Sequence, residues 1–319
     1  MKRKALWICA AALAAACFST SPAHAEGTAE FQDPVRLPEF NYPDADFITH
    51  TYGEVLQKAG YNVEYVKTDY TAHYTAIEYG DIDVSPAIWS SVKDLLEKAL
   101  ASGQVTKIGS LGVKIRETWW YPNYVATLCP GLPDWTALTK PDCIKALSTP
   151  ETEGKINYLG TPPDYSSDDE HRVPALGLQV HTTLPGTIAT MVATMQAAIQ
   201  KKQPIIGFGF VPHWLYGSDQ GSFVNFPPFE DACDKDPAWG VNPKAIGDCE
   251  LPRGDIFKII NNDFAKKAPF ATKILQDFTL SNEDVATGIS RQERDGKTAE
   301  ETAQEWMLAN EAKWATWLK

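Results

Sequence analysis

Apolar stretches alternate with amphipathic stretches along the first 130 residues, and this pattern predicts strands alternating with helices. Predicted strands lie at 35–40, 63–66, 81–88, 105–111 and 118–127. Predicted helices lie at 47–59, 75–79 and 92–101, and the longer two are ended by Gly60 and Gly103. Alternation of this kind favours an α/β fold, in which a mostly parallel sheet is flanked by helices.

A second unit of the same kind is predicted to begin near residue 124. Strands at 155–159 and 205–210 flank a helix at 187–200, whose apolar residues recur at helical spacing. The loop 227–252 is rich in Pro, Asp and Cys, and the chain is mostly helical from 263 onward. We therefore predict a first lobe at 26–123, a second lobe at 124–228, and a crossover back to the first lobe at 229–319.

The N-terminus has the pattern of a cleavable signal peptide, with a basic start, an apolar run to about residue 18 and Ala23-His24-Ala25. We predict cleavage after Ala25, so that 1–25 is excluded from the fold and the protein is periplasmic. Cleavage would remove three positive charges and take the formal net charge from −12 to about −15. This acidity argues against nucleic-acid binding. No later apolar run reaches the ~20 residues needed to cross a bilayer.

The remaining cysteines are Cys129, Cys143, Cys233 and Cys249, and an even number in an oxidising compartment predicts two disulfides. Three pairings are possible. The local pairing, Cys129 with Cys143 and Cys233 with Cys249, is favoured because each pair flanks one short loop-like stretch. A zinc site is the alternative, but no Cys-x-x-Cys and no nearby His pair supports it. We predict no metal and no cofactor.

Three aromatic clusters end apolar, strand-like stretches: Trp89, the run from Trp119 to Tyr124, and Trp214. Strand ends are where α/β domains place ligand-facing loops, and aromatic faces gathered in a cleft attract methylated amine cations. The alternative for each tryptophan is a place in the core. Because neighbours alternate along a strand, Trp119 and Tyr121 share one face and Trp120 takes the other. One of the three is expected to face the cleft, and Trp119 is the candidate.

These clusters resemble, in order, motifs of the glycine betaine/proline betaine-type (quaternary amine) substrate-binding proteins of ABC importers. The matching segments are Gly80-Asp81-Ile82-Asp83-Val84 with Trp89, Trp119 to Tyr124, Val211-Pro212-His213-Trp214, the loop from Cys233 to Cys249, and Leu280-Ser281-Asn282-Glu283-Asp284. The resemblance runs from about residue 35 to 317. It implies a two-lobed periplasmic binding protein (type II-like) with a ligand cleft between lobes that close by hinge motion.

In that family the methylated nitrogen sits in an aromatic box built from both lobes. Carried over by motif, Trp89 and Trp214 are box members. Tyr165 and Tyr42 stand where family members commonly have tryptophan, which leaves the identity of the ligand open.

The resemblance places the ligand's carboxylate near Ser166 and Ser167, and Ser167-x-x-Glu170 is a possible helix cap whose free amides would bind an anion. Asp44, beside Tyr42, suits a hydroxyl-bearing cation such as choline, or else caps the following helix. Glu117, beside the double tryptophan, is a further polar candidate.

We therefore predict a monomeric substrate-binding protein that delivers a small N-methylated amine to the membrane permease of an ABC importer. Glycine betaine-like osmolytes come first, and choline, trimethylamine N-oxide and carnitine are alternatives. An amino-acid or polyamine binding protein usually has an Arg–carboxylate clamp or convergent acids, and no arginine falls in a candidate motif. A hydrolase lacks support because no Gly-x-Ser-x-Gly elbow and no metal-ligand spacing of histidines occur, so we predict no enzyme.

Overall fold

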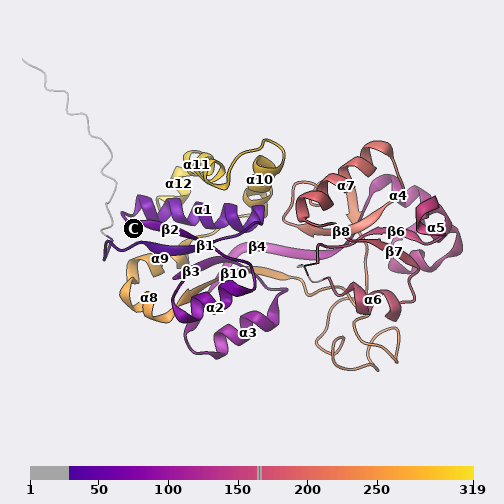
Figure 1. Cartoon of the computed structure of the whole chain (residues 1–319), viewed down its shortest axis with the longest axis horizontal. Helices are drawn as coiled ribbons and strands as arrows, with labels where there is room; N and C mark the ends of the chain where they lie inside the picture. The colour runs from indigo at the N-terminus through magenta and orange to yellow at the C-terminus, as the bar shows by residue number, and fades with distance from the viewer. Residues whose placement is uncertain (1–28, 164, 166) are drawn as a thin grey trace, which may run out of the picture.

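The computed structural model describes residues 29–163, 165 and 167–319 (Figure 1). The predicted signal peptide and Ser166 lie outside the described residues. The chain forms two lobes side by side, and a long strand, β4, runs from one lobe into the other (Figure 1). None of the described helices is long and apolar enough to cross a membrane.

The first lobe combines the N-terminal part of the chain with its C-terminal helices. Its strands are β1 Val35–Glu39, β2 Val63–Lys67, β3 Val84–Trp89, the first part of β4 Val105–Pro122, and β10 Gly254–Asn261. Its helices are α1 Pro43–Lys58, α2 Ala72–Tyr79, α3 Lys93–Ala101, α8 Asn262–Lys267, α9 Pro269–Asp277, α10 Asn282–Glu293, α11 Ala299–Ala309 and α12 Glu311–Trp314. Ser281 and Thr298 form the predicted capping boxes of α10 and α11.

The second lobe is built from the middle of the chain. Its strands are β5 Pro130–Pro133, β6 Ile156–Leu159, β7 Val180–Thr183, β8 Ile206–Val211 and β9 Gly221–Phe223. Its helices are α4 Asn123–Leu128, α5 Pro141–Leu147, α6 Asp169–Ala175 and α7 Ile188–Lys201, with short 3-10 helices at Trp135–Thr139 and Pro150–Thr152. The two-lobed α/β fold is thus as predicted, while the exact lobe bounds at 123 and 228 stay a prediction.

One sheet continues through both lobes, in the strand order β3-β10-β4-β8-β6-β7, and β9 pairs with β4. Strands β6, β7 and β8 are parallel, but β10 runs antiparallel to both β3 and β4. The sheet is therefore mixed rather than mostly parallel, because β10, which lies in a stretch where no strand was predicted, inserts between two strands of the first lobe. The partner of β4 changes from β10 to β8 between Ile115 and Arg116.

The structure corrects two strand predictions. The strands predicted at 105–111 and 118–127 are one strand, because Gly109 and Gly112, with φ of 132° and 97°, allow bulges that shift the register with β10 without ending the ladder. The predicted strand 118–127 also ends earlier, at Pro122, which has no N–H to extend the ladder, and α4 follows directly.

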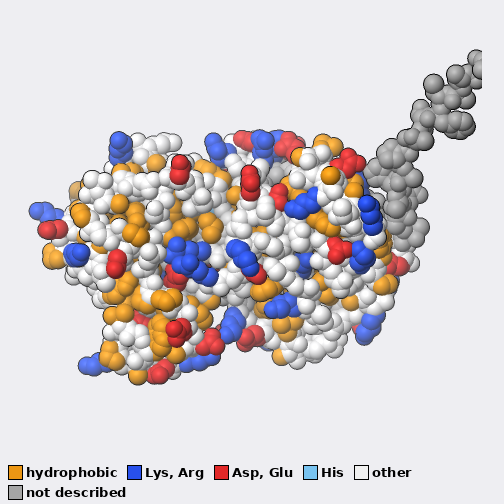
Figure 2. Space-filling model, turned by 180° about the vertical axis from the view of Figure 1, so that it is seen from behind, with side chains coloured by type: hydrophobic (Ala, Val, Ile, Leu, Met, Phe, Trp, Pro, Cys, Tyr) orange, Lys and Arg blue, Asp and Glu red, His pale blue; other side chains and the backbone are white. Residues whose placement is uncertain are grey.

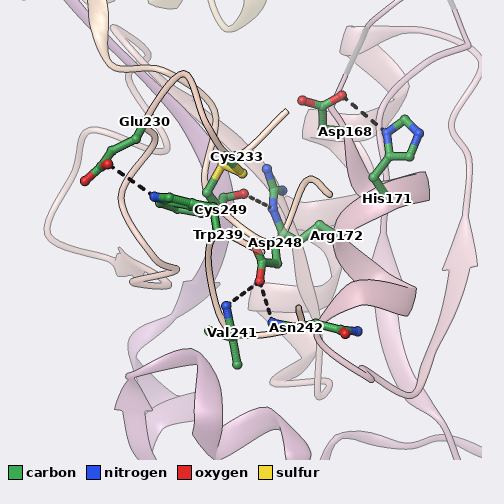
Figure 3. Close-up of a disulfide and its surroundings, with 10 residues drawn as sticks. All are labelled: Asp168, His171, Arg172, Glu230, Cys233, Trp239, Val241, Asn242, Asp248 and Cys249. Carbon is green, nitrogen blue, oxygen red and sulfur yellow. Dashed lines mark hydrogen bonds and ion pairs between the residues drawn. A yellow bond between two sulfur atoms is a disulfide. The ribbon is translucent and has the colours of Figure 1, made fainter. Parts of the chain in front are cut away.

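Both disulfides have the favoured local pairing, Cys129–Cys143 and Cys233–Cys249. Figure 3 shows the second of them, where Arg172 of α6 donates from Nε to the carbonyl of Cys249 at 2.8 Å. Within the same loop, the carboxylate of Asp248 accepts the backbone N–H of Val241 and of Asn242. The loop 227–252 is therefore fastened to the second lobe before the chain returns to the first lobe as β10.

Seen from behind, basic side chains stand among acidic ones on both lobes (Figure 2). The whole chain has 29 Lys and Arg against 41 Asp and Glu. Among the described residues, this face shows no continuous basic stripe of the kind that binds nucleic acid.

Candidate functional site

Aromatic side chains from both lobes meet at the junction between them. The first lobe supplies Tyr42, just before α1, and Trp89, the last residue of β3. The second lobe supplies Tyr165, in the loop after β6, and Phe210 of β8. Ring centroids lie 6.5 Å apart for Tyr42 and Tyr165, 5.9 Å for Trp89 and Phe210, and 6.4 Å for Tyr165 and Phe210. We call Tyr42, Tyr70, Trp89, Tyr165 and Phe210 the aromatic cluster.

Tyr70 and Phe210 are the members that sequence reasoning missed. Tyr70 packs edge-on against Tyr42, at 6.1 Å, and its hydroxyl accepts the backbone N–H of Trp89. No motif marks Tyr70 in the sequence. Phe210 does carry a signal, because it is the last residue of the predicted strand 205–210, next to the Trp214 motif.

In each lobe, one aromatic residue donates a hydrogen bond to a buried carboxylate: Trp89 in the first lobe and Tyr165 in the second. Asp44, in the first turn of α1, is 9% exposed, and its Oδ2 accepts from Trp89 Nε1 at 2.8 Å. Glu117, on β4, is 2% exposed, and its Oε1 accepts from the Tyr165 hydroxyl at 3.0 Å. The other oxygen, Glu117 Oε2, is buried and has no hydrogen bond within the described part of the chain. The junction therefore holds aromatic faces and two acceptors.

Burial changes the protonation of both carboxyl groups. Desolvation raises the pKa of Glu117 to about 7, although Ser91 and Tyr165 favour its ionised form, and the neighbouring charge of Asp44 raises it further. Burial also raises the pKa of Asp44, while the hydrogen bond from Trp89 opposes this change. Near neutral pH, Glu117 is thus present both as a carboxylate that accepts and as a carboxylic acid that donates.

Trp214 lies in the turn after β8, next to the first lobe's α10. Its Nε1 donates to Glu293 at 2.7 Å, and its ring packs against His213, with centroids 5.5 Å apart. Trp89 connects to this turn through Phe210, which packs on His213 at 5.0 Å. A direct role of Trp214 in holding the ligand stays a prediction.

Trp119 does not face the junction, contrary to the prediction. It is 0% exposed in the core of the second lobe, where it stacks on Tyr158 at 4.1 Å and donates from Nε1 to Asp169 at 2.7 Å. The predicted alternation is confirmed. Trp119 and Tyr121 share this core, whereas Trp120, on the opposite face of β4, belongs to a different hydrophobic cluster. Trp119 therefore does not reach the junction, whereas Trp120 lies in the same hydrophobic cluster as Trp89 and Phe210. Glu117, two residues before Trp119, does reach the junction.

The loop that carries the predicted anion site is only partly described. Ser167 is half-buried and Ser166 lies outside the described residues. The predicted helix cap at Ser167 is wrong, because the N-cap position of α6 is Asp168, one residue later, and no side chain caps it. Binding of a carboxylate at these serines stays a prediction.

Asp169 anchors the start of α6, directly after this loop. Its carboxylate accepts from Trp119 Nε1, from the Tyr158 hydroxyl and from Arg172. We expect Asp169→Ala to lower the free energy of unfolding by about 3–5 kcal/mol, because it leaves the fully buried Arg172 without its charge partner. Urea unfolding measures this, with Glu170→Ala as the control at an exposed neighbouring carboxylate. An unchanged midpoint for Asp169→Ala would contradict the assignment.

Within the described residues, Cys233, Asp234 and Cys249 form a group whose spacing could suit a metal ion. Both of its sulfur atoms are engaged in the disulfide, and a metal ligand must be a thiolate. This group therefore does not have the donors of a metal site.

A sequence profile of the OpuAC family, the substrate binding domain of ABC-type glycine betaine transport systems, matches residues 33–309. Among similar proteins, a trimethylamine N-oxide-binding protein of Pelagibacter ubique (strain HTCC1062) is 31% identical over 299 residues, covering 91% of this chain and 92% of that protein.

Two solved structures share the fold at low identity. Lactococcal OpuAC in its closed-liganded conformation with glycine betaine has a TM-score of 0.64 at 17% identity, covering 90% of this chain and 99% of that one. An ABC-transporter choline binding protein in complex with choline has a TM-score of 0.67 at 16% identity, covering 89% and 91%. With the family profile and the close sequence relative, these findings show that the chain belongs to the OpuAC family of substrate-binding domains of ABC-type glycine betaine transport systems.

Proposed function

We propose that this protein captures trimethylamine N-oxide between its lobes and delivers it to the membrane permease of an ABC importer. The observation that carries the proposal is the pairing of buried carboxyls with aromatic rings at the junction, Asp44 with Trp89 and Glu117 with Tyr165. The 31% identical relative, a trimethylamine N-oxide-binding protein, supports the same choice of ligand.

The aromatic cluster suits the methylated end of such a ligand. A fully N-methylated nitrogen has no N–H to donate, and its positive charge is spread over methyl groups. Aromatic faces offer it a negative quadrupole and apolar contact at once, about 0.5–2 kcal/mol for each face. Several faces supply a large part of the ~8 kcal/mol needed for micromolar binding.

The polar end of the site selects among methylated amines. Glycine betaine and carnitine carry a carboxylate, which the ionised forms of the two buried carboxyl groups would repel. Arginine could compensate this repulsion, but the arginines of the described residues have other partners: Arg36 with Asp83, Arg116 and Arg253 with Glu250, Arg172 with Asp169, Arg291 with Asp295, and Arg294 over Trp214. An N-oxide needs only one donor. Protonated Glu117, through its free Oε2, can supply that donor.

The remaining parts of the proposal concern the setting of the protein. We infer that residues 1–25 direct export to the periplasm, that the protein works there as a monomer beside its permease, and that it releases its ligand chemically unchanged. The family of substrate-binding domains of ABC-type transport systems supports the place beside a permease and the release of an unchanged ligand.

A calorimetric panel at equal concentration tests the choice of ligand. We expect trimethylamine N-oxide to bind most tightly, choline next, and glycine betaine, proline betaine and carnitine more weakly, because only the last three bring a carboxylate to the two buried acids. Mass spectrometry of the ligand after incubation should recover it intact. Tightest binding of glycine betaine would instead favour a carboxylate site at Ser166 and Ser167, and turnover of the ligand would favour an enzyme.

A further inference from the structure

A carboxylate of the first lobe holds the turn that follows β8 in the second lobe. Glu293, the last residue of α10, accepts a hydrogen bond from Trp214 Nε1 at 2.7 Å through its Oε2. The same oxygen lies 3.3 Å from His213 Nε2. Two consecutive side chains of the second lobe thus converge on one oxygen of the first. Trp214 makes a hydrogen bond to it, whereas His213 Nε2 approaches it without a hydrogen bond within the described residues.

The surroundings of His213 fix which of its nitrogen atoms carries the proton. Its Nδ1 accepts the backbone N–H of Leu215 at 3.1 Å, so the neutral ring has its proton on Nε2, the atom that faces Glu293. The His213 side chain is fully buried and that of Glu293 is 11% exposed. Polar contacts to a charged group are stronger in such a place than in water.

Arg294 strengthens the hold on Trp214. Its guanidinium lies over the indole, 5.0 Å from the ring centroid. Trp214 also borders a surface groove of about 390 Å³ with Ala286, Ser290 and Arg291 of α10. The indole is therefore held at its N–H by Glu293 and on one face by Arg294.

The end of α10 is connected to the aromatic cluster on both sides of the junction. Gln292 donates from Nε2 to the carbonyl of Pro43 at 2.6 Å, between Tyr42 and Asp44. In the second lobe, His213 packs on Phe210, and Phe210 packs on Trp89 and Tyr165. Separation of the turn from α10 would therefore draw Phe210 away from Trp89.

We propose that Glu293 is a positioning residue that keeps the lobes closed around the ligand by fixing His213 and Trp214 to α10. This inference rests on the proposed function as a ligand-binding protein. Because the lobes must separate before a bound ligand leaves, the contact acts mainly on the dissociation rate. Trp214 then helps to hold the two lobes closed, in addition to any contact that it makes with the ligand.

Stopped-flow kinetics and calorimetry with trimethylamine N-oxide test the proposal. We expect Glu293→Ala to raise Kd about tenfold, mostly through faster dissociation, within the usual range of coupling between sites. Glu293→Gln keeps an acceptor for the Trp214 N–H and should raise Kd less. Glu300→Ala, an exposed carboxylate on the neighbouring helix α11, is the control and should leave the kinetics unchanged.

A double-mutant cycle separates this role from a general loss of stability. Trp214→Phe keeps a ring but removes the N–H donor. If the contact couples the lobes, Glu293→Ala adds little to the dissociation rate once Trp214→Phe is present, and the thermal midpoints stay close to that of the wild type. Fully additive effects, or wild-type dissociation in Glu293→Ala, would overturn the proposal.

A measurement without ligand keeps this test independent of the proposed function. Spin labels at the exposed positions Lys58→Cys and Lys155→Cys, one on each lobe, report the distance between the lobes. Glu293→Ala is expected to shift the distances in the ligand-free protein to longer values, and an unchanged distribution counts against the contact. If the wild type binds none of the methylated amines, the proposed function fails while this result still stands.

Discussion

Replacing Trp89 by alanine is expected to weaken the binding of trimethylamine N-oxide about a hundredfold. The change removes an aromatic face, at about 0.5–2 kcal/mol. It also leaves buried Asp44 without the hydrogen bond from Trp89 Nε1, at about 1–3 kcal/mol. A combined loss near 3 kcal/mol corresponds to about two orders of magnitude in Kd. Isothermal titration calorimetry measures the change directly.

Two further variants identify which part of Trp89 matters. Trp89→Phe keeps a ring but loses the N–H donor, so its loss of affinity should be intermediate. Trp239→Ala is the control, because this half-exposed indole lies in the disulfide loop and bonds to Glu230 at 3.2 Å. It should bind like the wild type. Binding by Trp89→Ala within about threefold of the wild type would remove Trp89 from the site.

The affinity for trimethylamine N-oxide is expected to fall about tenfold for each pH unit above 7, and to level off below 7. Burial raises the pKa of Glu117 to about 7, and the N-oxide oxygen needs the protonated carboxyl as its donor. Above that pKa, binding must therefore take up a proton. Calorimetry at pH 8 in buffers of different ionisation enthalpy measures this uptake.

Choline and Glu117→Gln provide the controls for this pH dependence. The ammonium of choline favours ionised Glu117, so its affinity should instead rise as the pH increases through 7. Glu117→Gln has an amide that donates at every pH, and it should remove the slope for both ligands. Any slope that remains in this variant belongs to Asp44, whose pKa is also raised. A pH-independent affinity of the wild type would show that Glu117 does not bind the oxide.

The fold and part of the site could be predicted because they depend on local pattern. Helical periodicity, capping boxes at Ser281 and Thr298 and the short cysteine spacings are all encoded within about 20 residues. Trp89 could be recognised because it ends a strand, and its bond to Asp44 joins two residues that the sequence had already singled out.

The rest depends on contacts between distant segments. Nothing in the sequence near Trp119 indicates that its indole N–H would donate to Asp169, 50 positions later, in the core of the second lobe. The place of β10 between β3 and β4 depends on where the chain returns after the disulfide loop, and Gly254 to Asn261 show no pattern that specifies this partner. The bond between Glu117 and Tyr165 likewise joins residues from different elements, so neither segment alone predicts it.

The continuity of β4 has a consequence for the mechanics of ligand capture. This strand exchanges β10 for β8 between Ile115 and Arg116, so a rotation of the lobes would pivot one residue away from Glu117. A side chain beside the pivot sweeps the smallest arc, whereas side chains farther from it sweep a longer one. An arriving ligand would thus contact the nearly stationary carboxyl of Glu117 first, and the rings of the aromatic cluster would close on it afterwards.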